Sequence, residues 1–246
     1  MASSTTSGQP GAPTPNKLSA KSAGVVSIAV ACSRVLGLIR EQVFASMFGA
    51  GVLMDAFNAA FRAPNLLRDL FAEGALSTAF VTVFSKKIAT EGDDSAWRLA
   101  NKIATLAVVF MSLVTLVGIG LAPKIISILA GGFPPEKAAL TVTLTRIMFP
   151  FILLVSLAAL AMGMLNARKI FGMPAMASSF FNLGSIIGGV VFGYWLDPTL
   201  GEKAILGLAF GTLLGGLLQL VVQFPSLWKV GFRFRPALRW LDPGVK

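Results

Sequence analysis

The chain has no histidine and only one cysteine, Cys32, among its 246 residues. Without histidine, the usual proton shuttle at neutral pH is missing, and no Ser-His-Asp site, Cys-His site or His-ligated metal site can be assembled. A single cysteine also excludes a disulfide framework and a thiolate metal cluster. We therefore expect no metal and no cofactor, and the composition argues against the hydrolytic chemistry of soluble enzymes.

Charged residues are also scarce, because Asp, Glu, Lys and Arg make up only 13% of the chain, while 55% is hydrophobic. A soluble domain has about 25% charged residues. Four long segments carry no charge, namely residues 103–123, 147–167, 204–228 and the Gly- and Ser-rich residues 170–196. Each reaches the ~20 residues that a helix needs to cross about 30 Å of hydrocarbon. The sequence therefore predicts an all-α, polytopic membrane protein.

The hydrophobic pattern divides the chain into three parts. Residues 1–20 are rich in Ser, Thr, Pro and Gly, which predicts a disordered tail. Residues 21–228 form a predicted bundle of six transmembrane helices, the second running from Gly51 to Lys87 and the fourth kinked at Pro150. Residues 229–246 alternate basic and apolar side chains, as in an amphipathic linker at the membrane interface or a basic stop-transfer flank.

The first predicted helix, residues 21–48, has a second interpretation. Its apolar run 23–32 resembles a signal peptide, even a lipoprotein signal with Cys32 as the acceptor. Ala29 stands where such a signal has a large aliphatic residue, and Arg34 follows almost at once. We therefore favour a membrane helix.

The distribution of positive charge predicts the orientation. With six helices both termini lie on one side, and the tail, the loops after the second and fourth helices and the C-terminal segment hold thirteen Lys and Arg. The opposite side holds only Lys124, Lys137 and Lys203. Cytoplasmic loops carry the excess of positive charge, so we predict cytoplasmic termini in a bacterial inner membrane. The same rule explains much of the net charge of +10 without a nucleic-acid partner.

One stretch contradicts the apolar pattern, because charged residues recur where the first two helices should be only apolar: Arg34, Arg40, Glu41, Asp55, Arg62, Arg68, Asp69 and Glu73. A charge at bilayer depth costs on the order of 3 kcal/mol even on lenient scales. These side chains must therefore face water, one another or a charged ligand.

The spacing within this stretch places most of the polar residues on one helical face. In the second helix they recur every three or four positions, at Asp55, Asn58, Arg62, Asn65, Asp69, Glu73 and Ser77. Arg68 lies beside that face, which we call the polar stripe. In the first helix, Ser33, Gly37 and Arg40 share a face, and Arg34 and Glu41 share the neighbouring one. The stripe predicts one wall of an aqueous cavity or a polar seam between helices.

Two interpretations of these charges remain open. In a structural network, Asp55 would pair with Arg34 or Arg40, and Asp69 with Arg62. In a binding site, the arginines would hold a ligand, since guanidinium suits bidentate contact with phosphate. Polar amides nearby favour an anionic, phosphate-bearing amphiphile.

The charged stretch contains the motifs 33–41 (SRVLGLIRE), 48–51 (FGAG), 64–68 (PNLLR) and 71–75 (FAEGA). In this order and spacing they resemble the N-terminal part of the MurJ (MviN) family of lipid II flippases. Weaker matches follow at Pro174, Asn182 and 215–219. The family belongs to the multidrug/oligosaccharidyl-lipid/polysaccharide exporter superfamily and serves peptidoglycan synthesis. The resemblance implies a transporter, not an enzyme, with a cationic cavity for the pyrophosphate of lipid II.

The resemblance also assigns roles to residues. It implies that Arg34, Arg40 and Arg68 line the cavity, with Asp55 as an acidic partner, and it places Arg62 and Glu41 at family positions of matching charge. Weaker candidates for the same site are Ser33, Asn65, Glu73 and Asn182.

The chain differs from the family in length. Family members have about fourteen helices in two lobes, whereas this chain has six predicted helices. The resemblance therefore implies the N-terminal lobe of a flippase, with membrane lipids and a second lobe as further partners. Two alternatives remain open: an exporter of another lipid-linked oligosaccharide or a drug, and a lipid-binding or scaffolding fragment that transports nothing.

Overall fold

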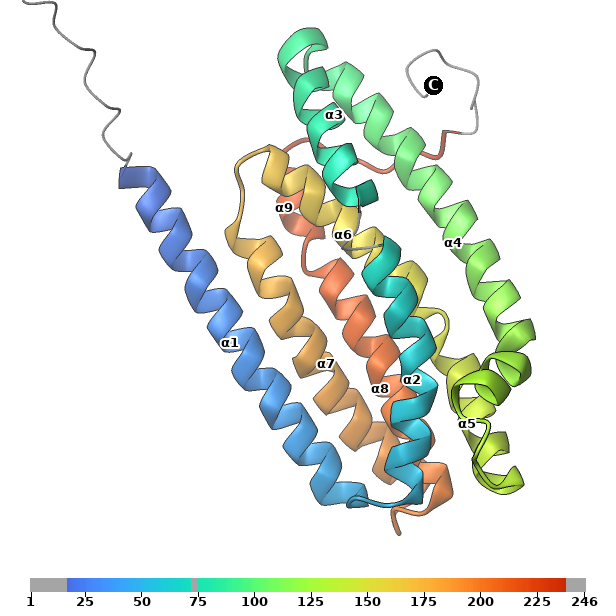
Figure 1. The fold of residues 1–246 in the computed structure, drawn as a ribbon. Coiled ribbons are helices and arrows are strands. Elements are labelled where there is room, and N and C mark those ends of the chain that lie inside the picture. The colour runs from blue at the N-terminus through green and yellow to red at the C-terminus, as the bar shows by residue number, and fades with distance from the viewer. Residues whose placement is uncertain (1–16, 72–74, 238–246) are drawn as a thin grey trace, which may run out of the picture.

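The computed structural model describes residues 17–71 and 75–237, in which every regular element is an α-helix (Figure 1). The long helices run alongside one another, with α1 beside α7 at one edge and α4 at the other (Figure 1). The helices are α1 (Lys17–Phe48), α2 (Val52–Phe71), α3 (Ala75–Glu91), α4 (Asp93–Leu129), α5 (Pro135–Met148), α6 (Phe151–Ala167), α7 (Gly172–Leu196), α8 (Glu202–Val221) and α9 (Phe224–Lys229). Of the predicted disordered tail, residues 1–16 lie outside the described residues, and α1 begins at Lys17.

Five stretches of the described residues are long and apolar enough to cross a membrane. They are Ala23–Phe48, Asp93–Leu129, Pro135–Ala167, Gly172–Leu196 and Glu202–Lys229, and they correspond to five of the six predicted helices. The remaining predicted helix corresponds to α2 and α3, which lie on either side of residues 72–74, outside the described part of the chain. α2 carries charges that make it less apolar than a simple span. The fold is the multi-pass, all-α membrane bundle that the sequence predicts.

Proline interrupts the fourth predicted helix. α5 ends at Met148 and α6 begins at Phe151, with Pro150 between them. Proline lacks an N–H group and its ring clashes with the preceding turn, so a helix bends or ends there. The break turns the ring of Phe149 against Gly118 of α4, where a Cβ would overlap the ring. The predicted kink at Pro150 is therefore confirmed as a full break.

Glycines make the seam between α7 and α8 the closest helix contact in the bundle. A Cβ on Gly207 would overlap the backbone of Gly193, and a Cβ on Gly211 would overlap the backbone of Gly189. Small residues allow membrane helices to approach until backbones touch, which replaces the hydrophobic driving force that lipid does not supply. This seam fixes α7, and α7 in turn holds α1 (Figure 1).

Asp197 closes the turn between α7 and α8. Its carboxylate accepts hydrogen bonds from the hydroxyl of Thr199 at 2.6 Å, the N–H of Thr199 at 3.0 Å and the N–H of Gly201 at 3.0 Å. The Thr199 hydroxyl bond is the main cause that lowers the pKa of Asp197 below its ordinary value, because each bond favours the charged carboxylate.

Asp197→Ala should therefore lower the unfolding temperature at neutral pH, and this difference from wild type should shrink in acid. A carboxylate with a lowered pKa stabilises the fold above its unfolded pKa, about 3.9, and the effect is lost as the pH falls through the lowered pKa. Thermal unfolding of both proteins from pH 7 to about pH 2 measures the effect. A difference that stays constant over this range would contradict the role given to the carboxylate.

Candidate functional site

α2 exposes the predicted polar stripe and buries its opposite face. Within the described part of the stripe, Asn65 is half-buried and the rest are exposed, namely Asp55, Asn58, Arg62 and Asp69. The buried face consists of Ala56, Phe57, Ala60, Ala63 and Pro64. Glu73 and the side chain of Ser77 lie outside the described residues. The stripe is therefore available to water or to a ligand rather than to the core of this bundle.

Arg40 and Arg68 line the same cavity, although they come from different helices. The cavity has a volume of about 350 Å³ and lies between α1, α2, α6, α7 and α8. Arg40 reaches it from α1 and Arg68 from the last turn of α2. We call it the arginine cavity. In Figure 1, α7 and α8 lie between α1 and α2, so the cavity joins two helices that scarcely touch beyond their turn.

A second cavity of about 370 Å³ adjoins the arginine cavity. Arg40 and Phe181 line both cavities, and Glu41 and Asn58 line only the second one. Phe181 packs against Phe151 with ring centroids 5.4 Å apart, and the guanidinium of Arg40 lies 5.5 Å from the centre of the Phe181 ring. The aromatic ring therefore supports Arg40 by a cation–π contact between the two cavities.

Both guanidinium groups are largely shielded from solvent, with 22% of the Arg40 side chain and 29% of the Arg68 side chain exposed. Arg68 donates to Asp69 from Nε at 3.0 Å and from Nη2 at 2.7 Å. Arg40 has only a distant carboxylate, because its Nη2 lies 3.8 Å from Oε1 of the exposed Glu41.

Arg40 has hydrogen-bond donors that no described residue uses. Within residues 17–71 and 75–237 its guanidinium donates no hydrogen bond, although it has five N–H donors in a planar fork. A charged group with so little exposure is costly unless it is paired and hydrogen-bonded. The arrangement therefore suits an added anion that accepts from Arg40 and lies beside Arg68.

Asn182 joins α7 to α1 next to Arg40. Its side chain is buried, and its Nδ2 donates to the backbone oxygen of Ser33 at 3.0 Å. Gly37 lies next to this amide, since a Cβ there would be in ordinary van der Waals contact with Nδ2, at 3.7 Å. Ser33 and Asn182 both line the arginine cavity, so this contact fixes how far Arg40 reaches into it.

The other sequence candidates lie outside the arginine cavity. Arg34 and Arg62 are exposed and form no ion pair within the described residues, and Asn65 lines neither cavity. Asp55 lies at the start of α2, where its Oδ2 accepts from Nζ of Lys137 on α5 at 3.1 Å.

The ion pairs differ from those of the predicted structural network. Asp55 pairs with Lys137 rather than with Arg34 or Arg40, because the start of α2 packs against α5. Asp69 pairs with its neighbour Arg68 rather than with Arg62. Among the described residues, Arg40 is therefore not paired with Asp55, and its one ion pair is the long contact with the exposed Glu41.

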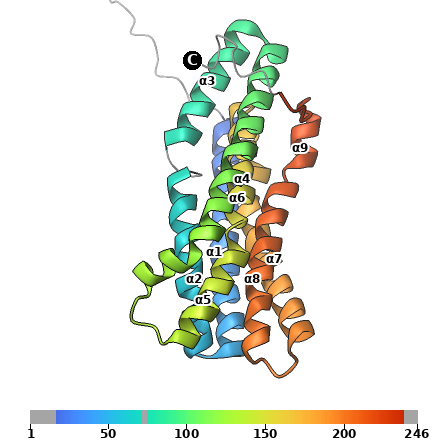
Figure 2. The same cartoon turned by 90° about the vertical axis from the view of Figure 1, so that its right-hand side faces the viewer.

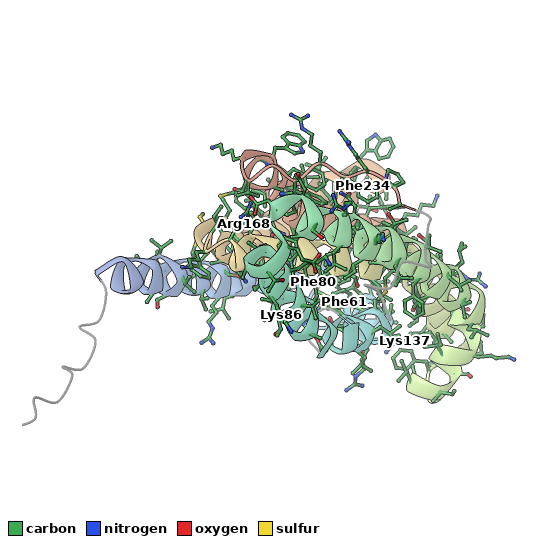
Figure 3. The ribbon with its side chains drawn as sticks, turned by 90° about the horizontal axis from the view of Figure 1, so that it is seen from above. Phe61, Phe80, Lys86, Lys137, Arg168 and Phe234 are labelled. Carbon is green, nitrogen blue, oxygen red and sulfur yellow. The ribbon has the colours of Figure 1, made fainter. Side chains whose placement is uncertain are left out.

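Lys137→Ala is expected to lower the free energy of unfolding by about 1 kcal/mol, the upper range for a partly exposed ion pair. Lys137, labelled in Figure 3, is only 13% exposed. Its Nζ also lies 3.9 Å from the centre of the Phe133 ring. Lys124→Ala is the matched control, because Lys124 is exposed and forms no ion pair with a described residue. Reversing the pair with Asp55→Lys and Lys137→Asp together should restore part of the lost stability, measured by denaturant unfolding. If the losses from the two single substitutions simply added in the double variant, the pair would contribute nothing to stability.

Sequence reasoning missed two amides of the arginine cavity, Gln219 and Gln223. Gln223 is buried, and its Nε2 donates to the backbone oxygens of Ala158 and Gln219, each at 3.0 Å. Both residues are uncharged and lie in an apolar segment, so a search for charges passes over them. Gln219 lies in α8 and Gln223 in the turn that follows it. Their spacing of four, which would place them on one face of the predicted sixth helix, is the signal that could have found them.

Fold and cavity together define a class of protein. The chain is a polytopic helical membrane protein with a polar, cationic cavity inside its bundle, suited to the phosphate group of an amphiphile. Among the residues that the structure describes, no three carboxylate or cysteine side chains gather to hold a metal.

Comparison with known proteins narrows this class to one family. Residues 44–246 match the family described as "Lipid II flippase MurJ". A Burkholderia cenocepacia protein named "Lipid II flippase MurJ" is 40% identical over 222 residues, which cover 87% of this chain and 42% of that protein. A Vibrio cholerae protein named "Probable lipid II flippase MurJ" is 38% identical over 236 residues, covering 92% of this chain and 44% of that protein. A solved structure described as "Lipid II flippase MurJ, inward closed conformation" is 26% identical with a TM-score of 0.70, and the match covers 87% of this chain and 44% of that one.

The chain therefore belongs to the MurJ lipid II flippase family, as the motifs of α1 and α2 predict. Membership places it with transporters rather than with enzymes. It spans less than half the length of these relatives.

Proposed function

We propose that this chain forms the N-terminal lobe of a lipid II flippase, in which Arg40 and Arg68 bind the pyrophosphate of lipid II. The observation that carries this proposal is the convergence of two guanidinium groups from α1 and α2 on one shielded cavity. Family membership supplies the ligand class, and the unused donors of Arg40 supply the reason that an anion is needed there.

Each part of the ligand would lie in surroundings that match its polarity. Pyrophosphate presents oxygens to both arginines, and guanidinium binds such oxygens bidentately. Ser33, Gln219 and Gln223 offer hydrogen-bonding groups to the sugar part, since all three line the same cavity. The polyprenyl tail stays in the surrounding hydrocarbon, because it is apolar along its length.

Transport follows from movement of this lobe against a second one. Residues 21–228 form the transmembrane lobe, residues 1–20 a tail and residues 229–246 a basic linker to the second lobe. In alternating access the two lobes rock as rigid bodies around a fixed site, driven by a gradient and without a covalent step. The excess of Lys and Arg at one end of the bundle supports cytoplasmic termini in a bacterial inner membrane.

The proposal is tested by comparing two ligands that differ only in the pyrophosphate. The purified chain in detergent should bind a polyprenyl pyrophosphate at least about 10-fold more tightly than the polyprenol of the same length, since each charge-assisted contact contributes more than 1 kcal/mol. Lipid II should displace the pyrophosphate. Equal binding of the polyprenol, or a lack of competition by lipid II, would refute the proposed function.

A further inference from the structure

A further cavity of the bundle lies away from Arg40 and Arg68. It has a volume of about 660 Å³ and runs between α4, α6 and the α8–α9 pair, which lie next to one another in Figure 2. Its walls are apolar, with Val108 on α4, Leu157 and Leu160 on α6, and Phe224 on α9. We call it the outer groove. It uses a different face of α6 from the one that lines the arginine cavity.

An extended segment, residues 230–237, forms one end of the outer groove. The backbone N–H of Arg235 donates to Oδ1 of Asn101 at 2.6 Å, and the N–H of Ala237 donates to Oγ1 of Thr105 at 3.1 Å. Phe232 is buried against Trp97, with ring centroids 5.5 Å apart. These contacts hold the segment along α4, so the side chains at the rim of the groove have a fixed backbone.

That rim is basic and has no acidic partner. Arg233 and Arg235 both line the groove and are exposed, and among the described residues no carboxylate pairs with either guanidinium. Phe234 lies between them, half exposed, at the outer edge of the bundle (Figure 3). Trp228 at the same end is 61% exposed, as aromatic residues are at a membrane–water interface.

The groove opens toward hydrocarbon rather than water. Exposed apolar residues flank it on both sides, with Leu113 on α4 and Leu217 and Val221 on α8. α4 and α8 belong to stretches that are apolar enough to cross a membrane. An occupant must therefore be apolar along the groove and negatively charged at the rim, which is the polarity of an anionic lipid of the bilayer leaflet.

We propose that the outer groove binds one anionic phospholipid. An acyl chain lies between α4, α6 and α8, and the phosphate contacts Arg233 and Arg235. The site holds a lipid of the leaflet itself and is separate from the arginine cavity, so it does not depend on the proposed flippase function. The bound lipid would fix the segment 230–237, and with it the direction in which the chain leaves the lobe.

Native mass spectrometry tests whether the groove binds an anionic phospholipid. The delipidated full chain is titrated with phosphatidylglycerol and, separately, with phosphatidylcholine of the same acyl chains. Wild type should retain one phosphatidylglycerol with roughly 10-fold or greater preference over phosphatidylcholine, given two arginines near the surface. Arg233→Gln with Arg235→Gln should abolish the preference. Lys86→Gln with Arg98→Gln removes the same charge from exposed sites on α3 and α4 outside the groove and should preserve it.

A second pair of variants tests the acyl-chain part. Val108→Trp fills the groove and should reduce retention of both lipids, whereas Val109→Trp, on the adjacent exposed position, should leave retention unchanged. Equal retention of the two lipids by wild type, or equal losses in each pair of variants, would overturn the proposal. Displacement of the phosphatidylglycerol by a polyprenyl pyrophosphate or by a second copy of the chain would also overturn it, because the groove would then have another occupant.

Discussion

Arg40→Ala should lower the affinity of the chain for lipid II roughly 100-fold, because a shielded guanidinium forms charge-assisted and bidentate bonds to phosphate. Arg68→Ala should have an effect of similar size, since both side chains line the arginine cavity. Arg40→Lys should be intermediate, because lysine keeps the charge and loses the planar fork. Affinities follow from titration of the purified variants with lipid II.

Two controls make this result specific to the cavity. Arg98→Ala removes an exposed arginine of α4 and should leave the affinity unchanged. Arg62→Ala is the second control. Arg62 stands at a family position of matching charge, but it is exposed and does not line the cavity, so its loss should not lower the affinity as Arg40→Ala does. A loss with Arg62→Ala as large as with Arg40→Ala would contradict the assignment of the site to the arginine cavity.

Gly211→Ala should destabilise the bundle by about 3 kcal/mol, the upper range for overpacking of a well-packed contact. The added Cβ would overlap the backbone of Gly189 and lie 2.8 Å from the backbone oxygen of Ser185, so rotamer changes cannot relieve the clash. α7 and α8 must then separate, and α1 moves with α7. Denaturant unfolding in detergent measures the loss.

Gly120→Ala is the matched control for the seam. Gly120 lies inside α4, and a Cβ there has no neighbour within 4 Å. Alanine is the better helix former by about 1 kcal/mol, so this variant should be as stable as wild type or more stable. If the Gly211→Ala and Gly120→Ala proteins were equally stable, the close approach of α7 and α8 would contribute nothing to the free energy of unfolding.

The sequence predicts the spans and one face of the site because both depend on local patterns. The steps of three and four in α2 place Asp55, Arg62 and Asp69 on one helical face whatever lies opposite. Pro150 interrupts its helix because its ring clashes with the preceding turn. These features are confirmed because no distant residue can change them.

Partners across helices could not be predicted in the same way. The partner of Asp55 is 82 positions away in the sequence, and its identity depends on how α5 packs on α2. Arg68 lies beside the polar stripe in the sequence, yet it meets Arg40 only because α7 and α8 set the distance between α1 and α2. Gln219 and Gln223 line the cavity only because α8 packs beside it, and this packing cannot be read from their spacing.

Photo-crosslinking to lipid II tests the central claim most directly. One variant carries a benzophenone side chain at position 178, because Ser178 lines the arginine cavity. The control carries it at position 187, because Ile187 is exposed on α7 and does not line the cavity. We predict a strong crosslink from position 178 that Arg40→Ala abolishes, and only background from position 187. Crosslinks of equal strength from the two positions, or a crosslink at 178 that survives Arg40→Ala, would contradict binding of lipid II by Arg40 in this cavity.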